Sequence, residues 1–438
     1  MSLSAGGVLV AVFMAGAPSA QASDSAPPTL TLAAAQAEAR QTAPESAELN
    51  ARVRAAELVY ADSGRVFRKD PSVLANFAPG AVVGKPDEYS WQAGLFFPLD
   101  LSTAWVTSRG SAEAALDAAH QNREDGLRAL DEAVAVAFAQ TAHAQRRVQR
   151  TTKISALVRI AAEAAREEAR VGKANQLEVD AAALDLAVAE AVLARSHGDL
   201  AQAQAWLNRL LGRLPDDSLV VEDPSEGEQP NAQASAMASV ATTVNQDPRV
   251  RGAEANLLSA RKELETYERQ RWPTITAGAS FGENRRDIPT TAFQGPASMG
   301  MSANWTDGEL RFSLGVPLSL LDRQTLPRAQ AAGRIEVAGA RVRSVRVAVA
   351  ADLQAVRAEL QSSVAALKAV AEVPGTIERD LDLMEKAVRS GAVDSVARAQ
   401  LLRRLEDAGL RYDTAVLDLR VALAHWERRT SPGSVEKR

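Results

Sequence analysis

Short segments of the chain carry apolar residues at every second position. Within residues 273–282, the stretch ITAGASF places apolar side chains on one face of a strand and small or polar ones on the other. Residues 89–99 and 309–318 alternate in the same way, and residues 72–83 have extended character. An apolar face opposite a small, polar face is typical of a transmembrane β-barrel strand. The strands alone equally fit a half-buried hairpin of a soluble protein.

Long Ala-rich stretches follow the strands and favour helix. Residues 102–170 contain no Pro, which predicts one helix of about 68 residues and about 100 Å. After a turn at Gly172, residues 175–211 are expected to return over only about 55 Å. A helix over residues 29–61, capped by one of the two Thr residues at its start, supplies the missing length if it stacks end to end on the returning helix.

The second half repeats the order helix, strand, strand, long helical hairpin. Its helices are predicted over residues 250–271, 327–389 and 394–430, with a kink or break at Pro374. Residues 84–89 and 283–308 are expected only to connect strands and to lie outside the cell. The predicted units are a first repeat over 23–215, a linker or equatorial segment over 216–247, a second repeat over 248–430 and a tail over 431–438.

Two pairs of landmark residues support an internal duplication. Pro98 and Pro317 mark the transitions from strand to helix, and Gly172 and Gly391 mark the helix turns. The members of each pair are 219 positions apart (317 − 98 and 391 − 172), half of the 438 residues. Because the segments around them also agree in type, we interpret the chain as two tandem copies of one unit.

The N-terminus has the features of an export signal. Residues 1–23 carry no charged side chain, Gly6–Ala17 is apolar, and small residues end at Ala22. This predicts a signal peptide over residues 1–22. The alternative, a membrane anchor, would need roughly 20 apolar residues. Because a signal peptide ordinarily begins with positive charge, the sequence also suggests a true start upstream of Met1.

Composition excludes several kinds of site. The chain has no Cys, which rules out disulfides, thiolate metal ligands and an N-terminal lipidated Cys. Its net charge of −5 comes from interspersed acids and bases, so no nucleic-acid partner is expected. All four His residues lie in predicted helices without metal-ligand spacing, and His197 and His425 are interpreted as repeated packing positions. No cofactor, metal or catalytic residue is predicted.

The strand count predicts an oligomer. Four strands per chain cannot close a barrel with a lumen, whereas three chains would supply twelve. Open strand edges cannot face lipid because their backbone groups would lack hydrogen-bond partners. Closure by three-fold symmetry would also join the helices of the three chains into a tube.

Five segments resemble the TolC-like outer-membrane factor family of tripartite efflux and type I secretion systems. They are FFPLDLSTAWVTSRG, LGVPLSLLDRQTLPRAQ, WPTITAGASFG, RVGKANQLEVDAA and AWLNRLLG, and the resemblance spans residues 29–430. It implies a mainly α protein with a transmembrane β-barrel contribution. The homotrimer would join a 12-stranded barrel in outer-membrane lipid to a periplasmic helical tunnel of a Gram-negative bacterium. Substrates would pass from an inner-membrane pump, contacted indirectly, through a periplasmic adaptor and out.

The resemblance also assigns the two helix turns as periplasmic tips, where the adaptor docks and the closed tunnel narrows. The residues that match the tip pattern are Arg170, Val171, Gly172, Arg389, Ser390 and Gly391. In the alternative interpretation, the two glycines are only helix caps in the left-handed conformation.

Gating acids of the family fall just beyond the second tip, and here the sequence departs. The expected positions hold Ala397 and Gln400. A charged ring would instead involve Glu178, Asp180 or Asp394, with Arg398 as partner, although each alone is more often a solvated helix-face charge.

A periplasmic adaptor or structural coiled-coil protein remains the alternative function. It would share the hairpins and the export signal, but it would need neither the strand pairs nor the duplication. The sequence does not reveal the exported substrate.

Overall fold

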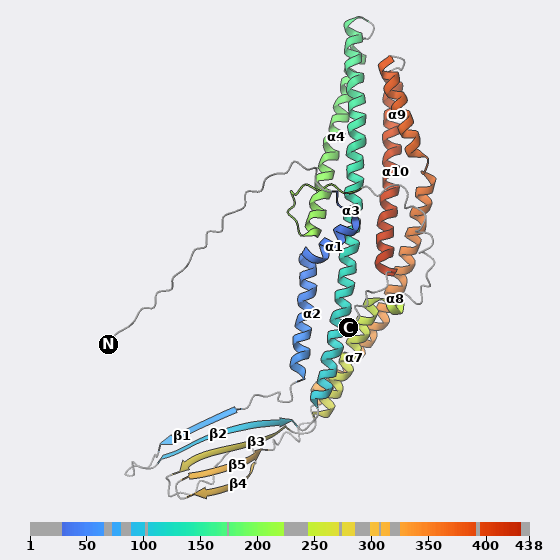
Figure 1. The fold of residues 1–438 in the computed structure, drawn as a ribbon. Helices are drawn as coiled ribbons and strands as arrows, with labels where there is room; N and C mark the ends of the chain where they lie inside the picture. The colour runs from blue at the N-terminus through green and yellow to red at the C-terminus, as the bar shows by residue number, and fades with distance from the viewer. Residues whose placement is uncertain are drawn as a thin grey trace, which may run out of the picture.

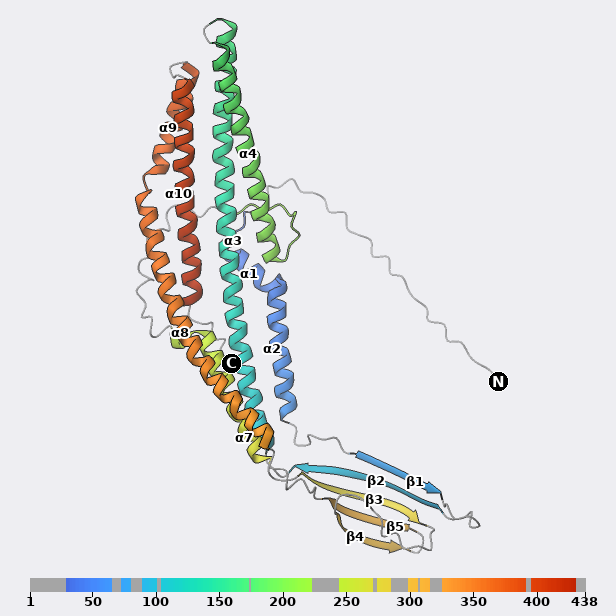
Figure 2. The same ribbon diagram turned by 180° about the vertical axis from the view of Figure 1, so that it is seen from behind.

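The computed structural model describes residues 29–64, 72–79, 89–100, 104–172, 175–222, 244–270, 274–284, 298–305, 308–315, 325–390 and 395–430. Long helices run side by side along most of the molecule, and a β-sheet lies at one end of them (Figures 1 and 2). The predicted signal peptide and the tail over 431–438 lie outside the described residues, as do Pro317, Gly391 and Asp394.

The first half builds its helices from local capping signals. α1 (Leu32–Thr42) starts where the Thr31 side chain accepts a hydrogen bond from the Ala34 backbone N–H, 3.2 Å away. α2 (Pro44–Ser63) follows after a single extended residue, Ala43. The sequence predicted one helix here. That prediction was wrong because Pro44 disfavours helical backbone at the residue before it and cannot donate to the preceding turn.

α3 and α4 form the long hairpin of the first half. α3 (Ala104–Arg170) is unbroken over 67 residues, and α4 (Gln176–Leu211) returns beside it. Asn175 caps α4 by accepting from the Glu178 backbone N–H. At the far end of α4, the Thr42 hydroxyl of α1 donates to the Leu211 carbonyl at 2.6 Å. The two shorter helices and α4 therefore lie end to end along α3 (Figure 1).

The second half has the same order with a break in its long helix. α7 (Pro248–Arg269) packs against both α3 and α8 (Thr325–Ala369). α9 (Val373–Ser390) continues after the break next to Pro374, where the sequence predicts one. α10 (Ser395–Thr430) returns between α3 and α8.

The sheet has five strands in the order β1-β2-β3-β5-β4, and all pairings are antiparallel. The strands are β1 (Ser72–Pro79), β2 (Tyr89–Asp100), β3 (Thr274–Asn284), β4 (Ser298–Trp305) and β5 (Gly308–Gly315). β2 pairs with β3, so the sheet joins the two halves of the chain. The sequence predicted four strands and treated residues 283–308 as a connection. That count was wrong, because Ser298–Trp305 pairs along β5.

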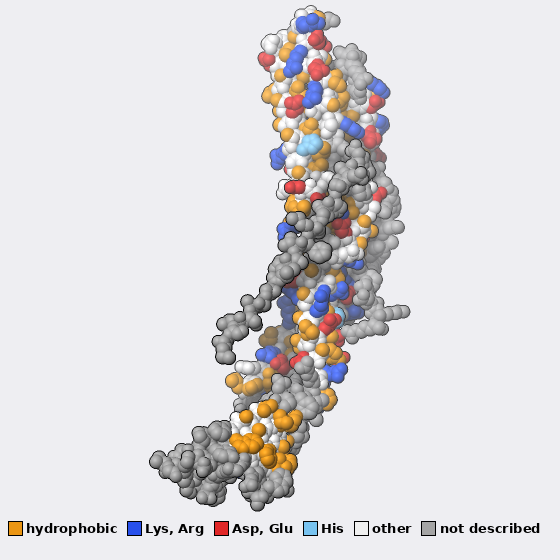
Figure 3. Space-filling view, turned by 60° about the vertical axis from the view of Figure 1, so that its left-hand side comes forward, with side chains coloured by type: hydrophobic (Ala, Val, Ile, Leu, Met, Phe, Trp, Pro, Cys, Tyr) orange, Lys and Arg blue, Asp and Glu red, His pale blue; other side chains and the backbone are white. Residues whose placement is uncertain are grey.

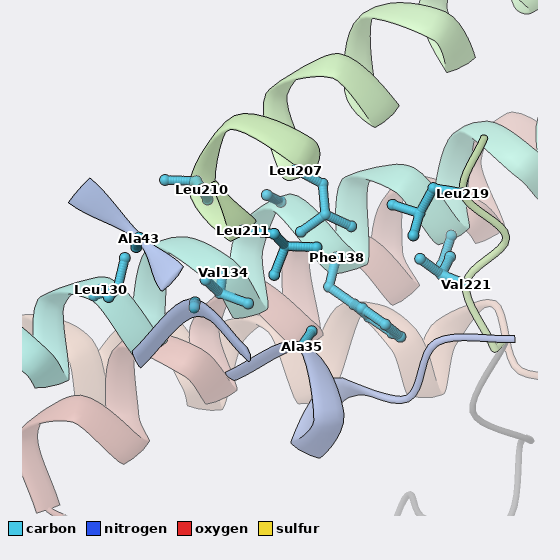
Figure 4. Close-up of a cluster of buried hydrophobic side chains, with 13 residues drawn as sticks. Ala35, Ala43, Leu130, Val134, Phe138, Leu207, Leu210, Leu211, Leu219 and Val221 are labelled. Carbon is cyan, nitrogen blue, oxygen red and sulfur yellow. The ribbon is translucent and has the colours of Figure 1, made fainter. Parts of the chain in front are cut away.

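A buried core lies where α1 and the end of α4 meet the middle of α3 (Figure 4). Leu207 and Leu211 of α4 are fully buried there against Val134 and Phe138 of α3. Leu219 and Val221 join the same core, and a β-bridge pairs Val221 with Leu30. This described part of the predicted linker is thus packed against the helices.

Candidate functional site

Side chains of the sheet separate by face. Val73, Leu95, Ala279 and Phe312 occupy neighbouring register positions across β1, β2, β3 and β5. Val73 is 74% exposed and Phe312 is 55% exposed. The next row of the same face holds Phe97 and Leu314, both also exposed. Hydrophobic side chains accordingly gather on the described sheet surface in Figure 3. This face offers an apolar surface with no covering element among the described residues.

The opposite face carries mostly small and polar side chains, together with Leu74 and Phe96. The Gln92 amide donates to the Ser280 hydroxyl at 2.7 Å across β2 and β3. A Cβ added at Gly278 would lie 2.3 Å from Phe96, so glycine is required for the close approach of these two residues. Pro98 lies in β2 opposite Thr276, beyond the last residue of β2 that pairs with β1. Its missing N–H therefore costs no β1 hydrogen bond.

The first helix turn is the end of the α3–α4 hairpin (Figure 1). Gly172 has a φ of 75°, the left-handed region that the sequence predicts for it. A Cβ there would meet no atom within 4 Å, so the space around it is open. Val171 is 60% exposed, and the Arg170 guanidinium pairs with Glu167 at 2.8 Å. The turn presents an apolar and a basic side chain to solvent.

The acidic residues after this turn make local helix contacts. The Asn175 amide donates to the Glu178 carboxylate at 3.1 Å, which completes a reciprocal cap with the backbone bond described above. The Gln176 amide donates to Asp180 at 2.9 Å one turn further on. Both carboxylates lie on the exposed outer turn of α4 in the single chain.

The second turn is described only in part. Arg389 and Ser390 end α9, and Arg398 lies in α10. The side chains of these three residues are outside the described part of the structure. Gly391 and Asp394 lie outside it entirely. The predicted juxtaposition of Asp394 with Arg398 therefore stays a prediction.

An ion pair joins the two hairpins below the tips. Arg150 of α3 pairs with Asp413 of α10, and both side chains are largely buried. Burial is the main cause that lowers the pKa of Arg150, and the nearby Arg146 adds to it. A Cβ at Gly409 would clash with the Arg150 guanidinium, so α10 has glycine where the arginine crosses it. Breaking this pair would leave a buried charge.

A second polar cluster holds the lower end of α10. Arg428 pairs with Glu132 of α3 at 2.5 Å, and His425 lies between Glu132 at 3.5 Å and Glu359 of α8 at 3.2 Å. His197 is exposed on α4. The interpretation of His197 and His425 as repeated packing positions was wrong, because His425 lies between two carboxylates whereas the His197 side chain is exposed.

Neither a membrane helix nor a metal site is found in the described ranges. Every helix there is too short or too polar to cross a membrane. Across the same ranges, no three His, Asp or Glu side chains are grouped so that they could hold a metal ion.

Comparison with known proteins identifies the fold. A family model described as outer membrane efflux protein matches residues 83–213, which include β2, α3 and α4. The outer-membrane channel OprN is similar over 92% of this chain and 90% of that chain, with a TM-score of 0.69 and 16% identity. The resemblance to the outer-membrane efflux proteins is confirmed.

Two further structures of efflux-protein fold are similar over nearly their whole length. VceC of Vibrio cholerae, an outer membrane protein, has a TM-score of 0.67 and 15% identity over 92% of this chain and 96% of that chain. The MtrE outer membrane channel of Neisseria gonorrhoeae in its open state has a TM-score of 0.61 and 17% identity over 91% of this chain and 88% of that chain. No curated protein matches the chain.

Within this efflux-protein fold, the contacts between the two hairpins were not predicted from the sequence. Arg150, Asp413 and Glu132 look like ordinary helix-face charges in the sequence. Gly409 was the available signal, because a glycine inside a long helix often marks a close approach. It could not have named the residue that crosses it.

Proposed function

We propose that the chain is one protomer of a trimeric outer-membrane efflux channel that spans the periplasm and works with an adaptor and an inner-membrane pump. The observation that carries the proposal is an open sheet with an exposed apolar face at one end of a helical layer whose α3 is about 100 Å long. An apolar face of this kind suits lipid, and the long helices suit a conduit.

Both edges of the helical layer support association with further copies. Large exposed apolar side chains concentrate on the helices at its two edges, α2 and α4 on one side and α8 on the other. They are Leu58 and Val59 on α2, Leu177, Leu184, Val188 and Trp206 on α4, and Leu326, Val337 and Val347 on α8. In the chain, β1 follows α2 and α8 follows β5, and β4 lies beyond β5 at that end of the sheet. Joining opposite edges of neighbouring copies would bury these side chains and close a tube.

The tips are the proposed adaptor contacts. Val171 is exposed beside the left-handed Gly172, which gives an apolar docking point at the end of the hairpin. Arg170 and the described acids Glu178 and Asp180 surround it with charge. The second tip, with Arg389, Ser390 and Gly391, is proposed to act in the same way.

Mass measurement of the detergent-purified protein tests the trimer. We expect three copies per particle and a protein that needs detergent to stay in solution. The alternative, a periplasmic coiled-coil protein, predicts a particle that remains soluble without detergent. A stable monomer under both conditions would refute the channel proposal.

Substitution at the first tip tests adaptor docking. Gly172→Val should leave the trimer intact, because a β-carbon there meets open space and costs only about 1–2 kcal/mol of left-handed strain. Efflux in cells and cross-linking to the adaptor should both fall. Ala187→Val, which adds the same kind of bulk in mid-helix, is the matched control and should change neither. Normal efflux by a correctly assembled Gly172→Val trimer would remove the tip from the docking surface.

A further inference from the structure

The fifth strand, β4, occupies one edge of the sheet. β4 and β5 pair along their whole length, from Ser298 with Gly315 to Trp305 with Gly308. At the opposite edge, no described strand pairs with the outer side of β1. The outer side of β4 is likewise unpaired among the described strands, so β5 is paired on both sides within the chain while β1 and β4 are the two edge strands.

Because of their directions, the two edge strands β1 and β4 cannot pair antiparallel with each other between copies. Each neighbouring pair in the order β1-β2-β3-β5-β4 is antiparallel, so β1, β3 and β4 run one way while β2 and β5 run the other. A rotation about a barrel axis preserves strand direction. In a three-fold assembly, β4 of one copy would therefore meet β1 of the next in parallel.

Strand number gives the same result. Three five-stranded sheets contain an odd number of strands, and an odd number cannot alternate in direction around a closed ring. Bacterial outer-membrane barrels are antiparallel with an even number of strands. Without β4, the edges are β5 and β1, which run in opposite directions and pair antiparallel across every boundary between copies.

Resting on the proposed trimeric channel, we propose that β4 is an intramolecular cover for the β5 edge, which β1 of a second copy displaces when the trimer closes. The lengths match, because β1, β4 and β5 each have eight residues. The exchange replaces one eight-residue antiparallel ladder with another of the same length. Burial of the exposed apolar residues on α2, α4 and α8 then favours the assembled state.

A cover of this kind has a physical purpose before assembly. An unpaired strand edge offers a row of free N–H and C=O groups that templates non-specific pairing with other chains. β4 satisfies those groups on β5 while the protomer is alone, and its own outer side, which would run parallel to β1 of a second copy, becomes the edge. A partner strand that brings a helical interface with it can outcompete β4, whereas an unrelated strand gains only the ladder.

A disulfide that locks β4 in place tests the exchange. The chain has no Cys, so a pair introduced as Gly300→Cys and Ser313→Cys, which face each other in the register, is the only thiol pair present. Facing residues of antiparallel strands lie within reach of a disulfide. We expect the oxidised variant to remain monomeric and the reduced variant to trimerise like the parent.

A disulfide between β5 and its other neighbour, β3, is the control. Ala277→Cys with Leu314→Cys joins β3 to β5, a pairing that stays within one chain in both states. This variant should trimerise whether oxidised or reduced. Trimerisation of the oxidised Gly300→Cys/Ser313→Cys variant would overturn the exchange while leaving the channel proposal intact. A parent protein that never trimerises would overturn the channel proposal itself.

Removal of β4 provides an independent test. Deleting residues 285–306 joins Asn284 to Asp307 and leaves these two residues as the connection between β3 and β5. Asn and Asp tolerate the left-handed backbone of such a tight hairpin. The shortened protein should still trimerise. A folded deletion variant that stays monomeric would show that β4 belongs to the assembled barrel and would refute the proposal.

Discussion

The two long helices that leave the sheet, α3 and α8, have different surroundings. α3 runs unbroken for 67 residues and buries about a third of them, whereas α8 ends after 45 residues and buries about a sixth. α3 lies between α2 and α4 on one side and α7 and α10 on the other, while the described neighbours of α8 are α7 and α10. A helix within the layer is supported along its length, and a helix at the edge keeps apolar residues such as Val337 and Val347 exposed.

The two halves of the chain share an order of elements but not a structural role. In the second half, α7 and α10 pack against α3 of the first hairpin, and ion pairs join α10 to α3. Changes on α3 should therefore destabilise the protomer. Changes of equal chemistry on α8 and α9 should be tolerated by the single chain.

Breaking the ion pair between the hairpins should have the largest effect. Asp413→Ala leaves the buried Arg150 guanidinium without its partner, which should cost about 3–5 kcal/mol of unfolding free energy in urea. Asp407→Ala removes an exposed pair with Arg411 on the same helix and should cost at most about 1 kcal/mol.

The double change Arg150→Met with Asp413→Leu sharpens this test. Replacing both charges by apolar groups should recover most of the lost stability, because no buried charge remains unpaired. If Asp413→Ala proves as harmless as Asp407→Ala, the two hairpins are not coupled through this contact.

Proline substitutions test whether α3 depends on helix continuity more than α8 and α9 do. Ser155 of α3 lies 219 positions before Pro374, the offset that relates the two halves (374 − 155). Ser155→Pro should cost about 3 kcal/mol or more, because a mid-helix proline removes a backbone hydrogen bond and Ser155 is buried.

The reverse change, Pro374→Ser, should alter the unfolding free energy by less than about 1 kcal/mol, because Pro374 already lies in the first turn of α9. Circular dichroism during thermal unfolding measures both variants. Equal losses for Ser155→Pro and Pro374→Ser would mean that α3 is no more dependent on continuity than α8 and α9.

The two left-handed glycines should differ by a smaller amount. Gly212 has a φ of 73° and a Cβ there would lie 2.7 Å from the Thr42 carbonyl oxygen, whereas Gly172 combines the same backbone with open space. Gly172→Ala should therefore cost about 1–2 kcal/mol for backbone strain alone. Gly212→Ala should cost clearly more, because α1 must move away from α4. Urea unfolding of the two variants measures this difference. Equal losses of unfolding free energy would contradict the difference in packing around the two glycines.

The smallest effect should come from pH. Burial is the main cause that lowers the pKa of His143 below its usual 6.5, with Arg146, Arg147 and Arg150 contributing and Asp418 opposing. The unfolded chain therefore binds the proton first, so the contribution of His143 to stability is full above pH 6.5 and declines as the pH falls below it.

We expect the thermal midpoint of the parent to fall between pH 7.5 and pH 5.5 more than that of His143→Gln. This pH window lies above the ordinary pKa range of carboxyl groups. Burial raises the pKa of Glu427, but Glu427 is present in both proteins, so the difference between parent and His143→Gln reports on His143. Identical pH profiles for parent and His143→Gln would show that His143 does not titrate differently on folding.

Local signals account for the parts of the fold that the sequence determined. The Thr31 and Asn175 caps, the left-handed Gly172 and the break beside Pro374 are settled by a few neighbouring residues. Strand alternation likewise fixes which side chains share a face, because successive residues of a strand must point to opposite sides. Pro44 is a local signal of the same kind, because it divides α1 from α2.

Only the tertiary structure decided which surfaces meet. Periodicity shows that a helix has an apolar face, but not which helix covers it. The pairing of β2 with β3, the addition of β4 to β5 and the contact of Arg150 with Asp413 each join residues far apart in the chain. Their free energy depends on shape and desolvation at the contact, which exist only once the helices lie side by side. The sequence therefore determined the elements and their order, and packing decided their partners.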